Sequence, residues 1–415
     1  MQISRVQSQD QSFKGINTMS KKAANVVVNG AGSGIGKNYF RQYLLAKFAP
    51  KGVWAKWDTL KGIYKNQNVI GLNMGSMGMK NGHIADASDE AILNTFRHGN
   101  NLGDLPDSIK LGVKRTGAKT ELEDTREVFL TAESKRGKME EFKLEATYNP
   151  VNWAKYDPKT LIFLDSTGKN TTIPKLTAAA AGAAYALLSA PAKDDMLTVV
   201  PGINNKDLKK IEESGNVVSA ASCTTTCIAP YIKLMENKFG IESGFIDTTH
   251  AATASQNIHD KADAKSESKN RGSMDAMIPT TTGAAKAIGK VISRKNGHKI
   301  PLDGLATRVP TGDGSMAVIT LVLKNNTTVD EVKNVLKEAE KNRAYKNLIA
   351  SADKGSTSKD VLGRIESGLY VPEAIKVTNG NLLTMKVYYD NEFGYTRSYA
   401  TLASKVADRA LAKEA

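Results

Sequence analysis

The chain has 415 residues, enough for two or three domains of ordinary size. Its 40% hydrophobic and 24% charged residues are typical of soluble globular proteins, and its longest small-apolar run, 176–190, is too short to span a membrane. Two cysteines exclude a disulfide framework and a four-thiolate metal site, and residues 1–22 do not have the pattern of a secretory signal. We therefore expect a cytoplasmic protein with no metal and no membrane partner.

The formal net charge is +14. The basic residues are spread along the chain, without the blocks of like charge or the interleaved aromatic residues that nucleic-acid-binding proteins show. Nucleic acid is therefore not expected as a partner. A positive field of this size would favour a phosphorylated substrate or a dinucleotide.

The first half of the chain alternates between short apolar runs and helical patterns. After a polar segment over 1–22, expected to be a flexible extension, the run 25–30 predicts a buried strand that leads into a glycine-rich turn. Further strands are predicted at 69–73, 161–165, 186–189 and 197–201, with a helix over 37–48. This alternation predicts a mostly parallel sheet covered on both faces, as in a Rossmann domain. The polar stretch between about 75 and 150 predicts an irregular or antiparallel insertion.

The second half has a different pattern. Alternating strands over 316–323 and 382–389 are mixed with a helix over 328–342, which predicts an α+β domain with a mainly antiparallel sheet. The amphipathic stretch 396–411 predicts a final helix. We expect a dinucleotide-binding domain over 23–222, a catalytic domain over 223–395, and packing of 396–415 on the first domain.

The stretch 30–36, GAGSGIG, lies between a predicted strand and a predicted helix. Glycines at that place allow a tight turn, so that the helix amides can hold a pyrophosphate, although such a loop can also be a purely structural turn. The spacing has one residue more than G-x-G-x-x-G and also fits the short-chain dehydrogenase loop. That family needs a downstream Tyr-x-x-x-Lys, and only Tyr43 with Lys47 fits, too close to the loop to face a nicotinamide.

A carboxylate about 20 residues beyond such a loop usually binds the adenosine ribose. Asp58 lies near that distance, but the predicted second strand, 69–73, ends without an acidic residue. The sequence therefore leaves NAD and NADP both open as cofactors.

Both cysteines, Cys223 and Cys227, lie in the run 219–230, SAASCTTTCIAP. A metal pair would need further soft ligands, and the nearest histidine, His250, is far along the chain. Cys223 is either a buried small side chain or a nucleophile at a helix N-terminus, where the helix dipole would lower the pKa of its thiol. Cys227, one turn later, would point into the core.

The run 219–230 resembles the active-site segment of phosphorylating glyceraldehyde-3-phosphate dehydrogenases. Further segments resemble that family in the same order: TTHAATASQ at 248–256, IPTTTGAAKA at 278–287, GLATRVPT at 304–311 and YYDNEFGY at 388–395. Upstream, DSTG at 165–168, SAP at 189–191 and PGIN at 201–204 resemble its strand ends. The resemblance covers roughly 160–400, whereas residues 1–160 share only the glycine loop.

The resemblance implies a chemistry for Cys223 and His250. Cys223 would attack an aldehyde, hydride would pass to a nicotinamide, and inorganic phosphate would cleave the resulting thioester, with His250 pairing with the thiol and acting as general base. A homotetramer is also expected from the family.

The resemblance further assigns the binding residues. Thr253 and Arg308 would bind the phosphate of the substrate, and Asn391 the carboxamide of NAD, or of NADP. The inorganic phosphate would be held by Ser222, Thr224, Thr282 and Gly283, and the rest of the cofactor by Gly30, Gly32, Gly34, Ile35, Gly36, Thr167 and Gly168.

Several residues depart from the family pattern. Thr226 stands where the family usually has asparagine, and the Ser33-Gly34 pair adds a residue to the glycine loop and removes its arginine. Ala254-Ser255, beside Thr253, could alter the substrate preference. Two alternatives therefore stay open: an erythrose-4-phosphate dehydrogenase, which ends in hydrolysis, and a non-catalytic binding relative with the same fold.

Overall fold

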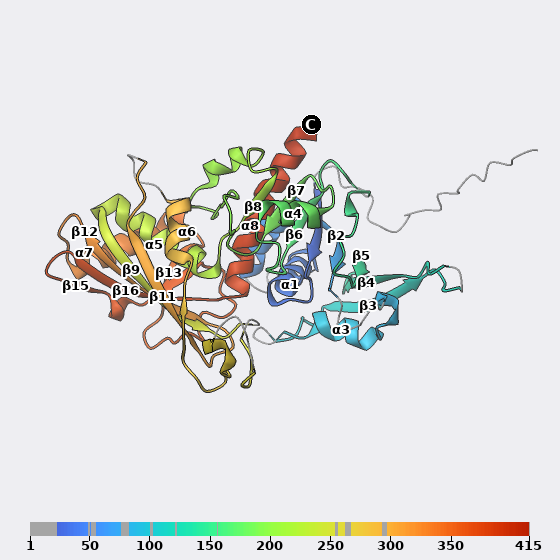
Figure 1. Ribbon diagram of the computed structural model, residues 1–415, viewed down its shortest axis with the longest axis horizontal. Helices are drawn as coiled ribbons and strands as arrows, with labels where there is room; N and C mark the ends of the chain where they lie inside the picture. Colours follow the sequence, from blue (N-terminus) through green and yellow to red (C-terminus); the bar gives the residue numbers. More distant parts are fainter. Residues whose placement is uncertain are drawn as a thin grey trace, which may run out of the picture.

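The computed structural model describes residues 23–48, 50, 55–75, 83–99, 103–120, 123–155, 157–253, 256–261, 267–292 and 297–414. The extension predicted over 1–22 and the pair Ala254-Ser255 lie outside the described residues. Two sheets with their helices form the two halves of the molecule, and helix α8 (Phe393–Glu414) runs beside the first sheet (Figure 1).

The strands of the first sheet lie in the order β3-β4-β5-β2-β1-β6-β7-β8. From β5 to β8 every neighbouring pair is parallel, whereas β3, β4 and β5 pair antiparallel. Their bounds are Ala24–Asn29 (β1), Gln67–Asn73 (β2), Ile109–Thr116 (β3), Glu127–Ser134 (β4), Met139–Glu145 (β5), Ile162–Asp165 (β6), Tyr185–Leu188 (β7) and Val217–Ser219 (β8). The predicted mostly parallel sheet is confirmed.

Strand β1 is apolar along its length because both of its faces are buried. Val26 and Val28 belong to the core that is shared with α1 (Gly34–Phe48), α2 (Ala55–Tyr64) and α8. Val27 points to the other face, where it shares a core with Leu176 of α4 (Ile173–Ala180). Because helices cover both faces, a strand in the middle of this sheet has no solvent side to make polar.

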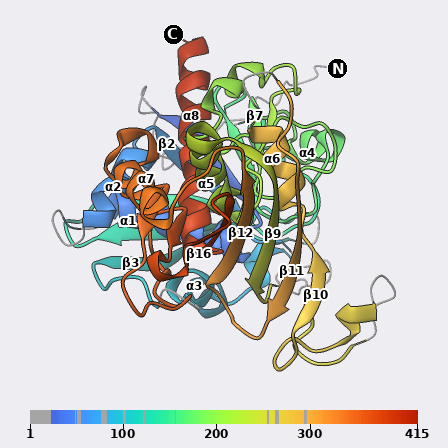
Figure 2. The ribbon, with the colours of Figure 1, turned by 90° about the vertical axis from the view of Figure 1, so that its left-hand side faces the viewer.

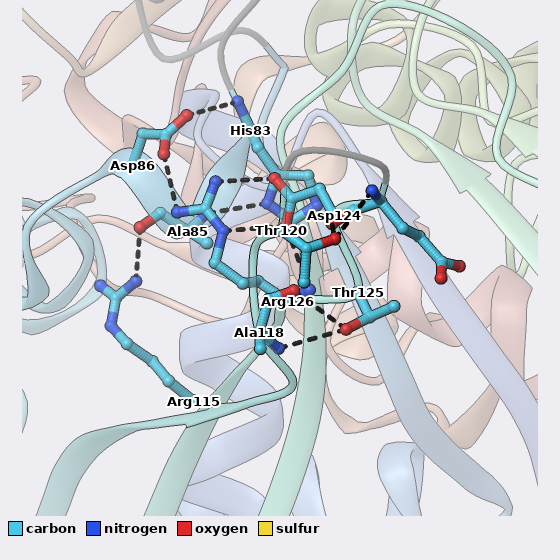
Figure 3. A network of polar contacts seen from close by, with 10 residues as sticks. His83, Ala85, Asp86, Arg115, Ala118, Thr120, Asp124, Thr125 and Arg126 are labelled. Carbon is cyan, nitrogen blue, oxygen red and sulfur yellow. Dashed lines mark hydrogen bonds and ion pairs between the residues drawn. The ribbon is translucent and has the colours of Figure 1, made fainter.

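The insertion between β2 and β5 adds β3, β4 and helix α3 (Asp89–Arg97) to the same half. Arg126 binds Asp124 and also pairs with Asp86 at 2.9 Å, and the Arg115 guanidinium donates to the carbonyl of Ala85 at 2.8 Å (Figure 3). These contacts fasten the turn before α3 to the β3–β4 hairpin. The antiparallel insertion predicted between 75 and 150 is therefore present, and it extends the main sheet.

The second sheet has the order β10-β11-β9-β12-β16-β14-β13, with β15 paired to β16. The pairs β9–β11 and β13–β14 are parallel and the other pairs are antiparallel, as the predicted mainly antiparallel sheet requires. The bounds are Ile241–Ala251 (β9), Ile278–Thr281 (β10), Leu302–Val309 (β11), Ser315–Leu323 (β12), Ile349–Ser351 (β13), Gly368–Tyr370 (β14), Lys376–Thr378 (β15) and Leu382–Tyr389 (β16).

Three helices pack with this sheet: α5 (Cys223–Phe239), α6 (Ala284–Val291) and α7 (Val329–Lys341) (Figure 2). Strand β12 alternates between buried and partly exposed residues along its whole length. Its buried side chains join those of the three helices in one core, so the alternation read from the sequence marks the covered face.

Two predicted elements differ from the structure. Residues 197–201 contribute only an isolated bridge, Thr198 to Ser219, because the Asn204 side chain takes up the amide of Val200 and the carbonyl of Thr198. The strand at that edge is β8. The final helix begins at Phe393, three residues before the predicted start. None of the described helices is long and apolar enough to cross a membrane.

Helix α8 contacts both halves. Tyr399, Leu402 and Val406 are fully buried in the core of the first sheet. On its other side, the Arg397 guanidinium donates to the carbonyls of Ile365 at 2.7 Å and Asn347 at 2.8 Å in the second half. The helix therefore completes one core while it is anchored to the other half.

Candidate active site

Cys223 is the first residue of α5, directly after a short connection from β8. The Ser222 hydroxyl caps the helix by accepting a hydrogen bond from the amide of Thr225 at 3.1 Å. Cys223 is half-buried and its side chain reaches the site, whereas Cys227, one turn later, is fully buried in the core of the second half. The helical spacing predicts this division between the two thiols.

His250 lies near the end of β9, with 8% of its surface exposed. Its Nε2 is 3.6 Å from the Sγ of Cys223, and its Nδ1 is 2.7 Å from the carbonyl oxygen of Ala251. The same Nδ1 is in contact with the Arg308 guanidinium, which only donates, so its two contacts require opposite states of Nδ1 and do not fix the tautomer. In the tautomer with its lone pair on Nε2, His250 can receive a proton from Cys223.

Arg308 of β11 lies opposite His250 of β9 in the parallel pairing. Its Nη1 donates to the carbonyl of Ala251 at 3.0 Å and lies against the Nδ1 side of the His250 ring. Burial and the neighbouring guanidinium charge together lower the pKa of His250 to about 4. The imidazole is therefore neutral near pH 7 and available as a base.

Asn391 closes the site from the turn between β16 and α8. Its Nδ2 is 3.8 Å from the Sγ of Cys223 and 3.3 Å from the Nε2 of His250. Its Oδ1 accepts from the Ser315 hydroxyl at 2.8 Å and from the amide of Gly314 at 3.2 Å, which fixes the direction of the amide group. Four residues from distant parts of the chain thus meet through direct contacts.

Several groups act on the pKa of the Cys223 thiol in opposite directions. Burial raises its pKa, while Asn391, Thr224 and the charge of Arg308 lower it, and burial prevails. The sequence led us to expect a lowered pKa at a helix N-terminus, and this expectation is wrong for the site as it stands. With a neutral thiol beside a neutral imidazole, the proton to be removed is on sulfur.

The residues assigned to the inorganic phosphate already have partners within the protein. Ser222 caps α5, and the buried Thr224 hydroxyl is 2.7 Å from the hydroxyl of Tyr389. The Thr282 hydroxyl accepts from the amide of Ala284 at 3.2 Å, and Gly283 caps α6 with open space where a Cβ would lie. Ser222 and Thr224 therefore flank the thiol, while Thr282 and Gly283 stand at the start of a different helix.

Thr253, assigned to the substrate phosphate, follows β9 by two residues. Its amide and its hydroxyl both donate to Oε1 of Gln256, at 2.8 Å and 2.9 Å. The side chain is exposed. Thr253 thus lies on a surface turn on the chain segment that leaves His250.

Tyr389 and Ser315 belong to the site but were not found from the sequence. The Tyr389 ring packs edge-on against His250, with 6.1 Å between ring centroids, and its hydroxyl meets Thr224. The alternation of strand 382–389, which buries Leu383, Met385 and Val387, extends to Tyr389 and could have placed it on the inner face.

The glycine loop lies between β1 and α1, as predicted. Gly30 has a φ of +78°, and a Cβ on Gly36 would be only 2.2 Å from the carbonyl oxygen of Gly30. The additional Ser33 donates from its hydroxyl to the carbonyl of Ser166 at 2.9 Å and accepts from the amide of Gly36 at 3.2 Å. The longer loop is therefore tied to the end of β6.

A cavity of about 650 Å³ opens beside this loop, where β1, β2 and β6 end. Gly30 and Thr167 line it, together with Lys169, Lys175 and Met74. Among the described residues that line it there is no carboxylate. Gly32, Gly34 and Gly36 follow Gly30 along the loop, Ile35 packs against the core of the first half, and Gly168 follows Thr167 in an exposed turn with a φ of +67°.

A chain of amide contacts joins three strand ends beside the cavity. Asn29 of β1 donates to buried Asp165 of β6 and accepts from Asn73 of β2, both at 2.8 Å. Asn73 donates in addition to the carbonyl of Thr147 at 3.0 Å. The side-chain amides of Asn29 and Asn73 therefore hold the strand ends together. Asp58, the other candidate for the ribose, pairs with Lys61 on the surface of α2.

Comparison with known proteins gives a consistent result. A family model described as "Glyceraldehyde 3-phosphate dehydrogenase, C-terminal domain" matches residues 222–391. The glyceraldehyde-3-phosphate dehydrogenase of Podospora anserina is 36% identical over 272 residues, which is 65% of this chain and 78% of that protein. The chain belongs to the glyceraldehyde-3-phosphate dehydrogenase family.

Other members of the family show similar coverage. The proteins of Clostridium pasteurianum and Bacteroides fragilis are 38% and 34% identical, over 74% and 78% of their lengths and 59% and 64% of this chain. The match to the C-terminal domain of the family contains Cys223, His250, Arg308 and Asn391. The glycine loop and the cavity precede it.

Proposed function

We propose that this chain is a phosphorylating glyceraldehyde-3-phosphate dehydrogenase, an oxidoreductase that converts glyceraldehyde 3-phosphate and inorganic phosphate to 1,3-bisphosphoglycerate with NAD or NADP. The observation that carries the proposal is the 3.6 Å contact between the Sγ of Cys223 and the Nε2 of His250. Family membership supplies the substrate class, since the relatives are named for this aldehyde.

The proposed sequence begins at Cys223. Its Sγ adds to the aldehyde carbon while its proton passes to Nε2 of His250 and from there to the carbonyl oxygen, giving a hemithioacetal. Loss of hydride from that carbon and of the hydroxyl proton to the neutral His250 leaves a thioester. Attack by phosphate then releases the acyl phosphate, and the departing thiolate takes the proton from His250, which restores the thiol. NAD or NADP, when bound, accepts the hydride. Its pKa of about 4 keeps the imidazole unprotonated near neutral pH, so it can accept a proton at each step, and the same low pKa makes it a weak base.

Two anion sites complete the proposal. Arg308 and Thr253 would bind the phosphate of the substrate, and Ser222, Thr224, Thr282 and Gly283 the attacking phosphate. The free space at Gly283, at the N-terminus of α6, and the charge of Arg308 support these assignments. Thr224 would need to share its hydroxyl with Tyr389.

The residues around the glycine loop fit a dinucleotide. Gly30 and Gly36 pack the loop against the start of α1, where backbone amides can hold a pyrophosphate, and the cavity lies at the carboxyl ends of parallel strands where nucleotides bind in such folds. Gly32, Gly34, Ile35, Thr167, Gly168 and Asn391 complete the proposed set. With no carboxylate among the described lining residues, NAD and NADP are both admitted.

The domain boundaries and the oligomeric state are also proposals. Separate cores under the two sheets support domains over 23–222 and 223–395. Exposed Phe245 and Leu305 on the second sheet support self-association into a homotetramer, for which light scattering after gel filtration is the test. We keep a cytoplasmic location as part of the proposal.

One assay separates the candidates. The purified chain is mixed with glyceraldehyde 3-phosphate or erythrose 4-phosphate, with NAD or NADP, with and without phosphate. We expect phosphate-dependent reduction with the triose phosphate, abolished in Cys223→Ala. Phosphate-independent oxidation of the tetrose phosphate would instead identify an erythrose-4-phosphate dehydrogenase. Retained ligand binding with no oxidation of either aldehyde would identify a binding protein.

A further inference from the structure

Two aspartates lie buried directly behind Asn391. Asp313 is in the turn before β12 and Asp390 follows β16, and they flank the antiparallel pair Ser315–Tyr389 at the end of these neighbouring strands. They are only 1% and 3% exposed. Two carboxyl groups buried together are costly when both are charged, so their arrangement requires an explanation.

Backbone amides surround both carboxyl groups. Oδ1 of Asp313 accepts from the amides of Gly314 at 2.7 Å and Asn391 at 3.0 Å. Oδ1 of Asp390 accepts from the amides of Glu392 and Phe393 at 2.8 Å and 2.6 Å, where α8 begins. Its Oδ2 accepts from the amide of Gly363 at 2.7 Å. The pair therefore holds the backbone on both sides of Asn391.

The two carboxyl groups are close enough to influence each other's ionisation. Burial, followed by repulsion from Asp313, raises the pKa of Asp390, and burial raises that of Asp313. Two adjacent buried carboxylates repel each other, so the pair favours a state with one proton, and it titrates as a unit.

The contacts lead from this pair to the reactive sulfur. Asp313 fixes the amide of Asn391, while Gly314 and Ser315 fix its Oδ1. The Nδ2 of Asn391 then has one direction left, toward Nε2 of His250 and Sγ of Cys223.

We propose that Asp313 and Asp390 form a proton-sharing pair that positions Asn391 against Cys223 and His250, and that loss of the shared proton releases this arrangement. These are positioning residues, since they touch neither the sulfur nor the imidazole through any contact described above. An effect of this pair on catalysis rests on the proposed function, whereas its effect on the reactivity of Cys223 does not.

Other charges around the pair come from the segment between β13 and β14 and from α8. The charge of Lys359 lowers the pKa of Asp313, and Asp390 accepts from the amide of Gly363, in the segment that carries the ion pair of Arg364 and Glu366. Glu392 follows on the same turn, and Cys223 and neutral His250 lie beyond Asn391. In the described part of the chain, Lys359 is the cation whose charge acts on Asp313 directly.

The test uses Asp313→Asn in the full chain. An asparagine can accept from Asn391 through Oδ1 and donate to ionised Asp390 through Nδ2, so it keeps the arrangement without a titrating proton. The readout is alkylation of Cys223 by iodoacetamide from pH 6 to pH 9, located by mass spectrometry. We expect the variant and the wild type to react alike at pH 6, and the variant to react about three- to tenfold faster at pH 9, because Asn391 keeps lowering the thiol pKa.

A spectroscopic readout tests the proton itself. Infrared spectra should show a protonated carboxyl band in the wild type at pH 6.5 that is absent from Asp313→Asn and from Asp390→Asn. The second variant carries the test if the first does not fold. Asp157→Asn is the matched control: Asp157 is buried and accepts from backbone amides, but it lies at the opposite end of the first sheet. It should lower the melting temperature and leave the alkylation profile unchanged.

The outcomes are distinct. A rate ratio that stays constant from pH 6 to pH 9, or a carboxyl band that persists in both variants, would overturn the proposal. Neither measurement needs aldehyde oxidation, so the pair can hold even if the proposed function fails. Conversely, if the enzyme is active and the rate ratio is constant, the proposed function stands and the proposed role of Asp313 and Asp390 is wrong.

Discussion

Arg308 and His250 are direct partners in the pairing of β11 with β9, and the guanidinium lies against the imidazole. No ion pair of Arg308 with a carboxylate is found within the described part of the chain. A cation placed beside a base keeps that base unprotonated. The same guanidinium is the proposed ligand of the substrate phosphate. One residue can therefore hold the substrate and tune the base.

Replacing Arg308 should affect both roles. In Arg308→Gln, we expect the pKa of His250 to rise from about 4, because the positive charge is lost. We also expect KM for the aldehyde to rise by about tenfold or more, since a charged hydrogen bond is worth roughly 1.5–3 kcal/mol. NMR titration of His250 and steady-state kinetics measure the two effects. Arg409→Gln, which breaks a surface pair with Glu212, is the control and should leave both unchanged.

The neutral state of His250 predicts a dependence of stability on pH. Its pKa is about 4 in the folded protein and about 6.5 when the chain is unfolded. Below pH 6.5 the unfolded chain binds a proton that the folded chain does not, so stability is lost as pH falls from 6.5 to 4. In His250→Asn this loss should be smaller, by at most about 1.4 kcal/mol per pH unit. Equal slopes in urea unfolding across this range would contradict a neutral, buried imidazole.

The two cysteines should respond differently to substitution. Cys223→Ala removes the proposed nucleophile, so we expect kcat to fall by about a thousandfold or more and labelling by iodoacetamide to disappear. Cys227→Ser places a hydroxyl in an apolar core, at a cost of about 1–3 kcal/mol in unfolding free energy, and should keep most of the activity. Similar activity losses in two folded variants would refute the division of roles.

Gly36 allows a sharper test of the loop. In Gly36→Ala the new Cβ would lie 2.2 Å from a backbone carbonyl, so the loop must shift. We expect a loss of stability of about 2 kcal/mol or more and at least tenfold weaker NAD binding by calorimetry. Gly62→Ala in α2 is the matched control, because within the described residues no atom beyond its chain neighbours and its own helix backbone lies within 4 Å of its Cβ position. It should stabilise the protein by about 0.5–1 kcal/mol.

The carboxylate missing from the cavity can be restored. Met74 follows β2 and lines the cavity, so Met74→Asp would introduce an acceptor for a ribose hydroxyl and repel a 2′-phosphate. We expect the ratio of NAD to NADP affinity to rise by about tenfold, measured by calorimetry with each nucleotide. Met139→Asp, at an exposed site of β5, should leave the ratio unchanged. An unchanged ratio in Met74→Asp would mean that the ribose binds elsewhere.

The main elements of the fold could be read from the sequence because hydrophobic period and burial agree. The uniform apolar run of β1 and the alternation of β12 each matched how their faces are covered. Residues 197–201 were misread because Asn204 caps that backbone through its side chain, a contact that leaves no periodic signal. The insertion was read only in outline, since it is held by polar contacts such as Arg126 with Asp86 rather than by a strong apolar pattern.

The sequence names candidate site residues where a local motif carries them. Cys223, His250, Arg308 and Asn391 were named from separate segments, and the structure brings them into contact. The pKa of Cys223 could not be foreseen, because burial depends on what the rest of the fold places over a helix N-terminus. The pairing of Asp313 with Asp390 was missed for the same reason, as 77 residues separate them in sequence and only the β12–β16 pairing joins them.

Helix α8 also constrains the order of folding. The chain makes all of the second sheet before it reaches Phe393, yet Tyr399 and Val406 fill the core of the first sheet. The amino-terminal half therefore keeps an open apolar face during synthesis until this helix emerges from the ribosome. Asn391, just ahead of the helix, reaches Cys223 at the same late stage. The contact between Asn391 and Cys223 can therefore form only after almost all of the chain has been made.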